Sequence, residues 1–281
     1  MENANMCSVP SLLHVSDILP FWTQFGREGA TSTRNFRGIT SCKIAVILYI
    51  ILCEIRFNVV TPEHIVQYNA ILSDMIFNKI ILDRSYAYFI HQAKLSQENI
   101  HILDQTELTS LITKGCNILP VGLYSESERV IKHYFLIVKF PDRDDFSIIS
   151  AYGNERIQVG LTGSLISYSD LLTFVNHVNT GNIDFVRQFI LHYFLNNNQN
   201  QECIGELNTY NIPLQLLYFH NLVGQIKHFV SSYELYTPIS QGGYKKRVHN
   251  KSVVIHRDRK SRTQRRRRRA THRRRRTTRR N

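Results

Sequence analysis

Two residues of this chain could form a thiol–imidazole pair: Cys42, at the start of an apolar helix, and His133, at the start of a predicted strand. In the segment TSCKIAVILYIILCEI, Thr40 or Ser41 can cap a helix, which places Cys42 in its first turn. Backbone N–H groups and the helix dipole favour an anion at that point, so the thiol is expected to ionise near neutral pH. An adjacent imidazole would supply the base that a nucleophilic cysteine needs.

The segment HYFLIVKFPDRDDFSIISAYGN, residues 133–154, predicts a β-hairpin that begins with this histidine. Residues 133–140 and 146–151 are rich in aromatic and β-branched side chains, and PDRDD between them supplies turn residues. A histidine at the start of a strand can also have a purely structural role at a sheet edge. The sequence of the hairpin alone leaves both interpretations open.

The remaining elements are predicted from hydrophobic spacing and from helix start signals. The apolar run 44–53 is too short to span a bilayer and predicts a buried helix. Other predicted helices cover 11–18, 61–82, 85–94, 105–114, 167–178 and 183–195, a further strand covers 117–125, and NNNQNQE (196–202) predicts a loop. Helices followed by an antiparallel sheet indicate an α+β fold.

This arrangement resembles the papain-like cysteine peptidases, over roughly residues 30 to 180. In that fold a central helix carries the cysteine at its N-terminus, and the histidine opens a strand of a small antiparallel sheet. An Asn or Asp at the end of the next strand orients the histidine and is followed by an aromatic residue and a glycine. In SIISAYG, Ser150 stands at the orienting position, Tyr152 at the aromatic position and Gly153 after it.

The resemblance therefore implies a catalytic set of Cys42, His133 and Ser150, and it departs from the family at Ser150. A serine can accept a hydrogen bond from the imidazole but carries no charge, and Asn154 is the nearby substitute. The family also places a side-chain amide before the cysteine to bind the oxyanion. Asn35 is the candidate here, and Gln24 is a weaker one.

The C-terminal segment is strongly basic and is expected to be disordered alone. From Lys245 onward it holds 19 of the 35 Lys and Arg residues and one of the 22 acids, so its charge is about +18 and the rest of the chain is about −5. Guanidinium groups pair with phosphates, which predicts sequence-independent binding of DNA or RNA. The residues expected to bind are Lys245, Lys246, Arg247, Arg265, Arg266, Arg267, Arg268, Arg269, Arg273, Arg274, Arg275 and Arg276. The expected division is a papain-like domain over 1–240 and a tail over 241–281.

The five cysteines are widely spaced and form neither a CxxC pair nor a zinc-ligand pattern with histidine. We therefore expect reduced thiols and no structural metal. We also expect no cofactor and, from the length of the apolar run 44–53, no membrane span. A globular domain of this charge with an arginine-rich tail resembles proteins of large DNA viruses. That resemblance implies a virion or intracellular location, such as host cytoplasm, viral factory or nucleus.

Two functions follow from these features. The first is a papain-like thiol hydrolase, either a cysteine protease or deubiquitinase-like, that acts on a protein or peptide and is tethered to nucleic acid by the tail. The second is a non-enzymatic nucleic-acid-binding structural or virion protein with an inactive papain-like domain. The distance between the Cys42 sulfur and the His133 ring is the feature that would separate them.

Overall fold

An antiparallel sheet forms the centre of the computed structural model, which describes residues 6–19, 41–55, 100–153, 158–210 and 213–232. The chain divides into two units, Met1–Tyr236 and Thr237–Asn281, and every described residue lies in the first. The sheet has six described strands in the order β1-β6-β2-β3-β4-β5. Their bounds are β1 (His101–Ile102), β2 (Ile118–Ser125), β3 (Val130–Lys139), β4 (Phe146–Gly153), β5 (Gln158–Ile166) and β6 (Leu214–Tyr218).

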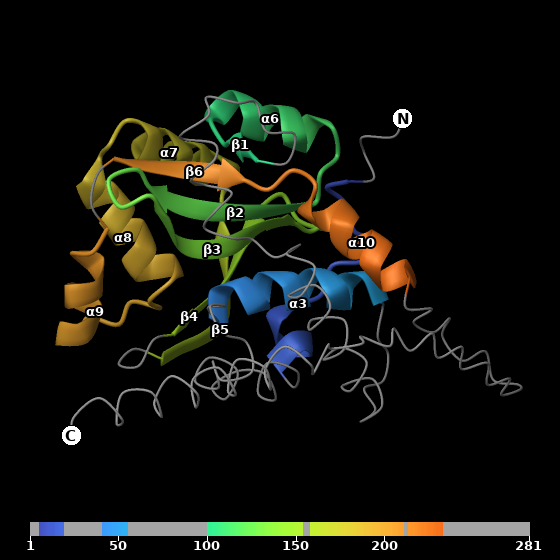
Figure 1. Cartoon of the computed structure of the whole chain (residues 1–281), viewed down its shortest axis with the longest axis horizontal. Coiled ribbons are helices and arrows are strands. Elements are labelled where there is room, and N and C mark those ends of the chain that lie inside the picture. Colours follow the sequence, from blue (N-terminus) through green and yellow to red (C-terminus); the bar gives the residue numbers. More distant parts are fainter. Residues whose placement is uncertain (1–5, 20–40, 56–99, 154–157, 211–212, 233–281) are drawn as a thin grey trace, which may run out of the picture. The chain divides into compact units, whose positions relative to one another are not determined.

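Helices cover both faces of this sheet (Figure 1). On one face α3 packs on β3 and β4, and α10 packs on α3. On the other face α7 packs on β6 and contacts α6 and α8, and α8 contacts α9. Their bounds are α3 (Ser41–Ile55), α6 (Gln105–Thr113), α7 (Tyr168–Asn179), α8 (Ile183–Tyr193), α9 (Gln201–Leu207) and α10 (Leu222–Ser232). The mixed α+β class predicted from the sequence is therefore confirmed.

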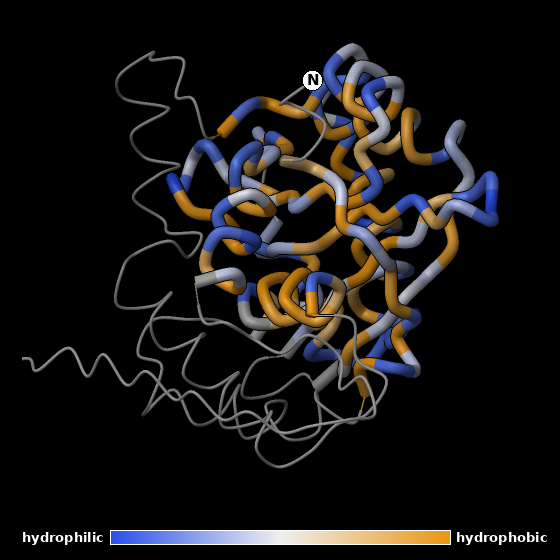
Figure 2. Tube along the Cα trace, turned by 90° about the vertical axis from the view of Figure 1, so that its right-hand side faces the viewer, coloured by the Kyte–Doolittle hydropathy of each residue, from blue (hydrophilic) through white to orange (hydrophobic). Residues whose placement is uncertain are grey.

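Hydrophobic residues run through the middle of the described fold (Figure 2). Strand β3 is buried on both faces, which explains why its sequence is nearly continuous in apolar residues. Successive side chains of a strand point to opposite faces. Tyr134, Leu136 and Val138 belong to the core cluster that includes α3, which we call the α3 cluster. Phe135 and Ile137 belong to the cluster that includes α7 and α8, which we call the α7–α8 cluster.

Helix α3 has the all-round apolar character expected of a central helix. The side chains from Ala45 to Cys53 are buried, and the Tyr49 hydroxyl donates a hydrogen bond of 2.8 Å to the Leu13 carbonyl. Near its C-terminal end, the Glu54 carboxylate lies 3.5 Å from the Lys227 ammonium of α10. These contacts fix α3 between the N-terminal segment 6–19 and α10.

The helices on the opposite face begin at polar caps that the sequence supplies. Ser167, Asn182 and Asn200 each accept a backbone N–H from the first turn of α7, α8 and α9 respectively. These contacts satisfy N–H groups that have no partner within the helix. The Asn200 cap also explains why α9 begins at Gln201, inside a segment that the sequence predicted as a loop.

Three sequence predictions about this region are wrong. His133 does not open its strand, because β3 begins at Val130 and lies between β2 and β4, so the residue is interior to the sheet. Cys7 and Cys116 are not free thiols but form a disulfide with a Cα–Cα distance of 4.9 Å. Their separation of 109 residues hides this pairing from any spacing argument. The segment 196–202 is a loop only up to the start of α9.

Most other predicted elements agree with the structure. The predicted strand 117–125 and helices 44–53, 105–114, 167–178 and 183–195 correspond to β2, α3, α6, α7 and α8. A short helix covers 15–19, within the region expected to hold one. The predicted helices 61–82 and 85–94 lie outside the described residues. Among the helices that are described, none is long and apolar enough to cross a membrane.

Candidate active site

His133 is fully buried in an aromatic cage on the α7–α8 side of the sheet. Its relative exposure is 1%. The imidazole centroid lies 4.3 Å from the ring of Phe194, 5.2 Å from that of Tyr152 and 6.3 Å from that of Phe135. Phe135 shares β3 with it, Tyr152 is the last residue but one of β4, and Phe194 follows α8. Three separate elements therefore position this one side chain.

Ser150 is the polar partner of this imidazole. His133 Nε2 lies 2.7 Å from Ser150 Oγ, and both residues are buried. The adjacent strands β3 and β4 set this distance, since Phe135 pairs directly with Ser150 in the ladder. When Nε2 carries the proton, Nε2–H donates a hydrogen bond to Ser150 Oγ, and Nδ1 keeps the lone pair that a general base requires.

Burial controls the charge of His133. Removal from water lowers the pKa of its imidazole from 6.5 to about 3, because the charged form loses its hydration. No carboxylate contributes to this shift. In the conformation observed, His133 is therefore a neutral imidazole at physiological pH.

Cys42 is the second residue of α3, as the sequence predicted, and its thiol is buried and takes no part in a disulfide. It packs in the α3 cluster, whereas the His133 ring contacts residues of the α7–α8 cluster. Among the described residues, the hydrogen-bond partner of His133 is Ser150, so the structure does not hydrogen-bond Cys42 to the imidazole. Burial is the main cause that raises the pKa of Tyr210, and an ionised Cys42 adds a smaller contribution, which places the thiol within electrostatic range of that residue.

Tyr152 connects this neighbourhood to α9. Its hydroxyl donates a hydrogen bond to Glu206 Oε1, and the Tyr210 hydroxyl lies close enough to influence its ionisation. Burial, followed by the effect of Tyr210, raises the pKa of Tyr152 well above its ordinary range. Tyr152, Tyr210 and Glu206 thus link the His133 cage to the vicinity of Cys42.

Glu206 and Tyr210 were not identified from the sequence. Glu206 lies 54 residues after Tyr152, on a helix that was predicted to be a loop in its first turn. The one feature of the sequence that pointed to this contact was Tyr152, shortly after Ser150. It suggested an aromatic ring that covers the imidazole, but it did not identify the residues that hold this ring in place. Asn35, Gln24, Asn154 and every basic residue assigned to nucleic-acid binding lie outside the described residues.

The other cysteines have chemistry unlike that of a nucleophile. Burial raises the pKa of Cys53 to about 12, so its thiol stays protonated. Burial also raises the pKa of Cys203, helped by Glu202 and Glu206. Cys7 and Cys116 are joined as a disulfide. Within the described ranges, no group of three His, Cys, Asp or Glu residues is arranged to hold a metal ion.

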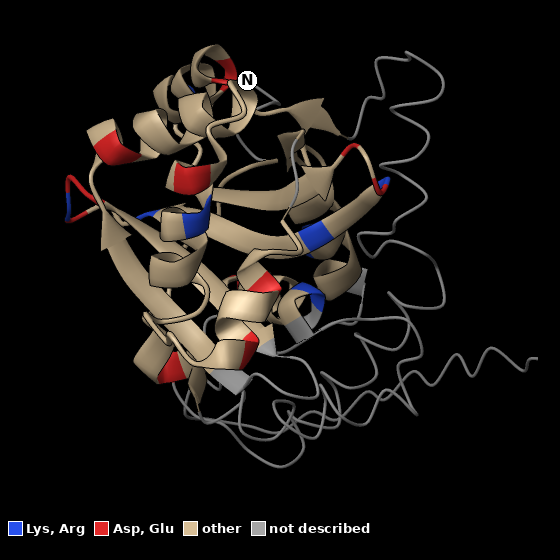
Figure 3. Cartoon of the chain, turned by 90° about the vertical axis from the view of Figure 1, so that its left-hand side faces the viewer, with Lys and Arg blue, Asp and Glu red and all other residues tan. Residues whose placement is uncertain are grey.

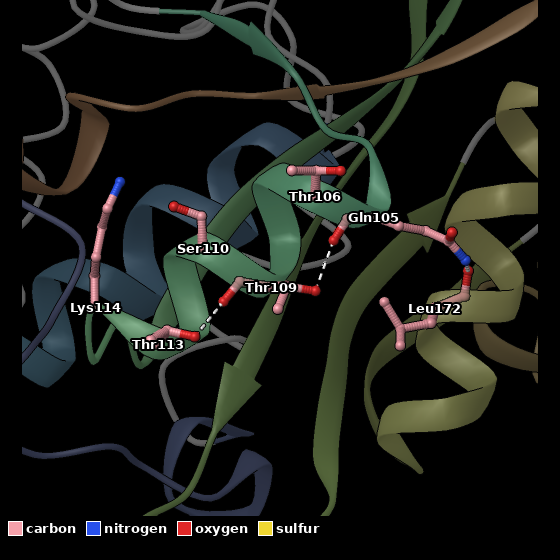
Figure 4. Close-up of a pocket in the computed structure, with 7 residues that line it drawn as sticks. All are labelled: Gln105, Thr106, Thr109, Ser110, Thr113, Lys114 and Leu172. Carbon is pink, nitrogen blue, oxygen red and sulfur yellow. Dashed lines mark hydrogen bonds between the residues drawn. The ribbon is translucent and has the colours of Figure 1, made fainter.

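A groove on α6 is separate from these residues (Figure 4). Thr106, Thr109, Ser110 and Thr113 line it, together with Gln105, Lys114 and Leu172. Thr109 and Thr113 use their hydroxyls to bond carbonyls one turn earlier in the helix, and Gln105 donates to the Leu172 carbonyl. Acidic and basic residues are scattered over the described part of this unit (Figure 3), and no charged group among the described residues contributes to the pKa shift of the imidazole.

Comparison with known proteins found no matching family model, no matching curated protein and no matching solved structure.

Proposed function

We propose that this chain is a papain-like thiol hydrolase that cleaves peptide or isopeptide bonds and is tethered to DNA or RNA by its basic tail. The observation that supports it is the hydrogen bond between His133 Nε2 and Ser150 Oγ on adjacent strands. This is the bond that a papain-like histidine makes to its orienting residue. Cys42 at the second position of α3 and Tyr152 against the imidazole give further support.

The proposed reaction uses each group in a defined role. Ser150 holds the Nε2 proton, so Nδ1 takes the proton from the Cys42 thiol. The thiolate attacks the carbonyl carbon, and the imidazolium returns the proton to the departing amine as the C–N bond breaks. Water then attacks the thioester, again with His133 as base, which releases the acid and restores the thiol. A serine stabilises the imidazolium less than a carboxylate would, so turnover is expected to be slow.

The enzyme must open before it reacts, because the imidazole is now buried and uncharged. His133 is 1% exposed and Cys42 is 6% exposed. A substrate carbonyl has to lie about 3 Å from the sulfur, with the imidazole within hydrogen-bond reach of the same thiol. The observed conformation is therefore proposed to be a closed state.

Labelling by a thiol-directed electrophile near neutral pH tests the hydrolase. We expect Cys42 to react faster than Cys53 and Cys203, and Cys42→Ala to abolish both labelling at this site and any hydrolysis. His133→Ala should slow the labelling, whereas Cys53→Ala, a substitution on the same helix, should leave it unchanged. Equal labelling of Cys42, Cys53 and Cys203, or no effect of His133→Ala, would rule out the hydrolase.

The second candidate is a non-enzymatic structural or virion protein that binds nucleic acid and has an inactive papain-like domain. The dry, neutral imidazole favours it, because an active thiolate–imidazolium pair needs a histidine that accepts a proton near neutral pH. This candidate gains support if Cys42 stays unreactive under conditions in which hydrogen exchange shows that the native fold opens locally.

Both candidates share the tail, and its role has a direct test. Removal of every residue after Gly243 should abolish binding to duplex DNA and to RNA, since the rest of the chain has a charge of about −5. With about ten phosphates engaged, affinity for duplex DNA should fall by several orders of magnitude between low and moderately high salt. Retained binding by the truncated chain would place the contact surface in the folded unit and contradict the tethering role.

A further inference from the structure

The His133 cage has one wall that is held from outside by polar groups, the Glu206 carboxylate and, close by, the Tyr210 hydroxyl. Phe135 and Phe194 are fully buried, whereas Tyr152 lies at the end of β4 and is 8% exposed. The Tyr152 hydroxyl donates to the Glu206 carboxylate of α9, a short helix of seven residues. The two phenylalanine walls depend on apolar packing, and the tyrosine wall depends in addition on this hydrogen bond.

We propose that Glu206 is a positioning residue: through the Tyr152 hydroxyl it holds the Tyr152 ring over His133, and breaking this hydrogen bond admits water and protons to the imidazole. The hydrogen bond has a charged acceptor, which makes it stronger than one between neutral groups. In this proposal Glu206 acts on the imidazole through Tyr152, from whose hydroxyl it accepts a hydrogen bond. This contact is therefore a latch on α9 that keeps the site closed.

Geometry around the latch makes Tyr152 the movable wall. Ser150 is held within the β4–β5 ladder, where it pairs with Thr162, and the register shifts immediately after Ala151. Tyr152 therefore follows an irregularity in its strand, which loosens the ladder locally. The titratable groups that lie around the imidazole and its cage are Tyr152, Tyr210, Glu206 and, in range of Tyr210, Cys42.

The catalytic consequence of this latch rests on the proposed function, but its effect on the imidazole does not. If Glu206 releases Tyr152, His133 becomes hydrated and its pKa rises toward the ordinary value of a histidine. An imidazole that accepts a proton near neutral pH is what the thiol chemistry of Cys42 would use. The latch thus gives a reason for a closed state with a neutral histidine in a hydrolase.

Titration of the His133 ring nitrogens by NMR in the full chain tests the latch. Tyr152→Phe keeps the ring but removes the hydroxyl, and Glu206→Ala removes the acceptor. Each of these two variants should raise the proton affinity of His133 by about tenfold or more, which moves the midpoint of its titration up by about one pH unit. Glu206→Gln can still accept the hydroxyl and should restore most of the wild-type titration.

Matched controls lie on the same elements. Glu202→Ala changes an exposed carboxylate on α9, and Tyr193→Phe removes a tyrosine hydroxyl at the end of α8. Neither should move the His133 midpoint. Unchanged titration in folded Tyr152→Phe and Glu206→Ala, or an equal shift in Glu202→Ala, would overturn the latch. A shifted titration without any reactivity at Cys42 would keep the latch and reject the hydrolase.

If Glu206→Ala unfolds, the readout moves to Tyr152→Phe, which removes a single oxygen. In the Tyr152→Phe variant, hydrogen exchange of the backbone amides of β4 should become faster at position 152 and stay unchanged at Ile148. Protection equal to that of the wild type at both amides would overturn the latch.

Discussion

The two faces of β3 bury ionisable groups in different ways. On the α7–α8 side, His133 is surrounded by aromatic rings and bonded to Ser150. On the α3 side, the next residue, Tyr134, lies beneath the buried Lys43, whose ammonium is 5.1 Å from the centroid of the ring. An ammonium over an aromatic face gains from the quadrupole of the ring. A neutral imidazole fits an apolar cage without a counter-charge.

This difference indicates where reactivity can change. The imidazole has a pKa that burial alone lowers, so the removal of one wall alters its charge without disturbing an ion pair. Lys43 is instead buried as a charged group, with its ammonium against the ring of Tyr134, a member of the α3 cluster. The α7–α8 face is therefore expected to respond to local opening and the α3 face to resist it.

The largest effect is expected from core truncations on adjacent residues of β3. Phe135→Ala should destabilise the fold by about 3–5 kcal/mol and Leu136→Ala by about 2–5 kcal/mol, because both side chains are fully buried. Only Phe135→Ala removes a cage wall, so only it should also raise the pKa of His133. Denaturant unfolding combined with the histidine titration measures both, and a His133 shift in Leu136→Ala would contradict the separation of the two faces.

The disulfide connects the two faces through segment 6–19. Cys7 belongs to the α7–α8 cluster, and Val9 and Ile18 belong to the α3 cluster. Cys7→Ser combined with Cys116→Ser should lower the free energy of unfolding by roughly 2–5 kcal/mol, as expected for loss of a native disulfide. Denaturant unfolding with and without reductant measures it. If reductant lowers the free energy of unfolding of the double variant as much as that of the wild type, the stabilisation comes from a bond other than Cys7–Cys116.

The sequence predicted those parts of the fold whose signals are local. Helices α7 and α8 follow from their spacing and caps, and β2, β3 and β4 from runs of apolar and β-branched residues. The start of β3 was misplaced because Val130, Ile131 and Lys132 follow a turn-like segment, SESER, that gives no sharp boundary. Strand β6 was missed because LQLLY is a short apolar run before α10, and its pairing with β2 depends on residues about 90 positions apart.

The candidate site was predictable only in part, for the same physical reason. Cys42, His133 and Ser150 were proposed because each occupies a defined place at a helix start or in a hairpin. The depth of burial of His133 depends on Phe194, and the latch depends on Glu206, both supplied by distant segments. No residue pattern near His133 carries that information.

Acid should destabilise the fold through His133. The pKa of His133 is about 3 in the folded chain and 6.5 in the unfolded chain. Between these two pH values the unfolded chain therefore binds a proton at His133 and the folded chain does not. Stability is unaffected by this group above pH 6.5 and falls by about 1.4 kcal/mol per pH unit below it, or about 2 kcal/mol by pH 5. His133→Gln should show a shallower loss over this window in pH-dependent unfolding. An unchanged slope would mean that His133 is hydrated in the folded protein.

The smallest effect is expected at the ion pair between α3 and α10. The Glu54 and Lys227 side chains are 14% and 23% exposed and their charged atoms lie 3.5 Å apart. Both side chains are partly exposed, so Lys227→Met should cost about 1 kcal/mol or less, and added salt should reduce the difference. The His133 titration should not change, since the pair lies on the α3 side. A loss of about 3 kcal/mol or more would show that Glu54 is left as an isolated buried charge. The α3 face would then also depend on a charged contact, which would remove the contrast with the His133 cage.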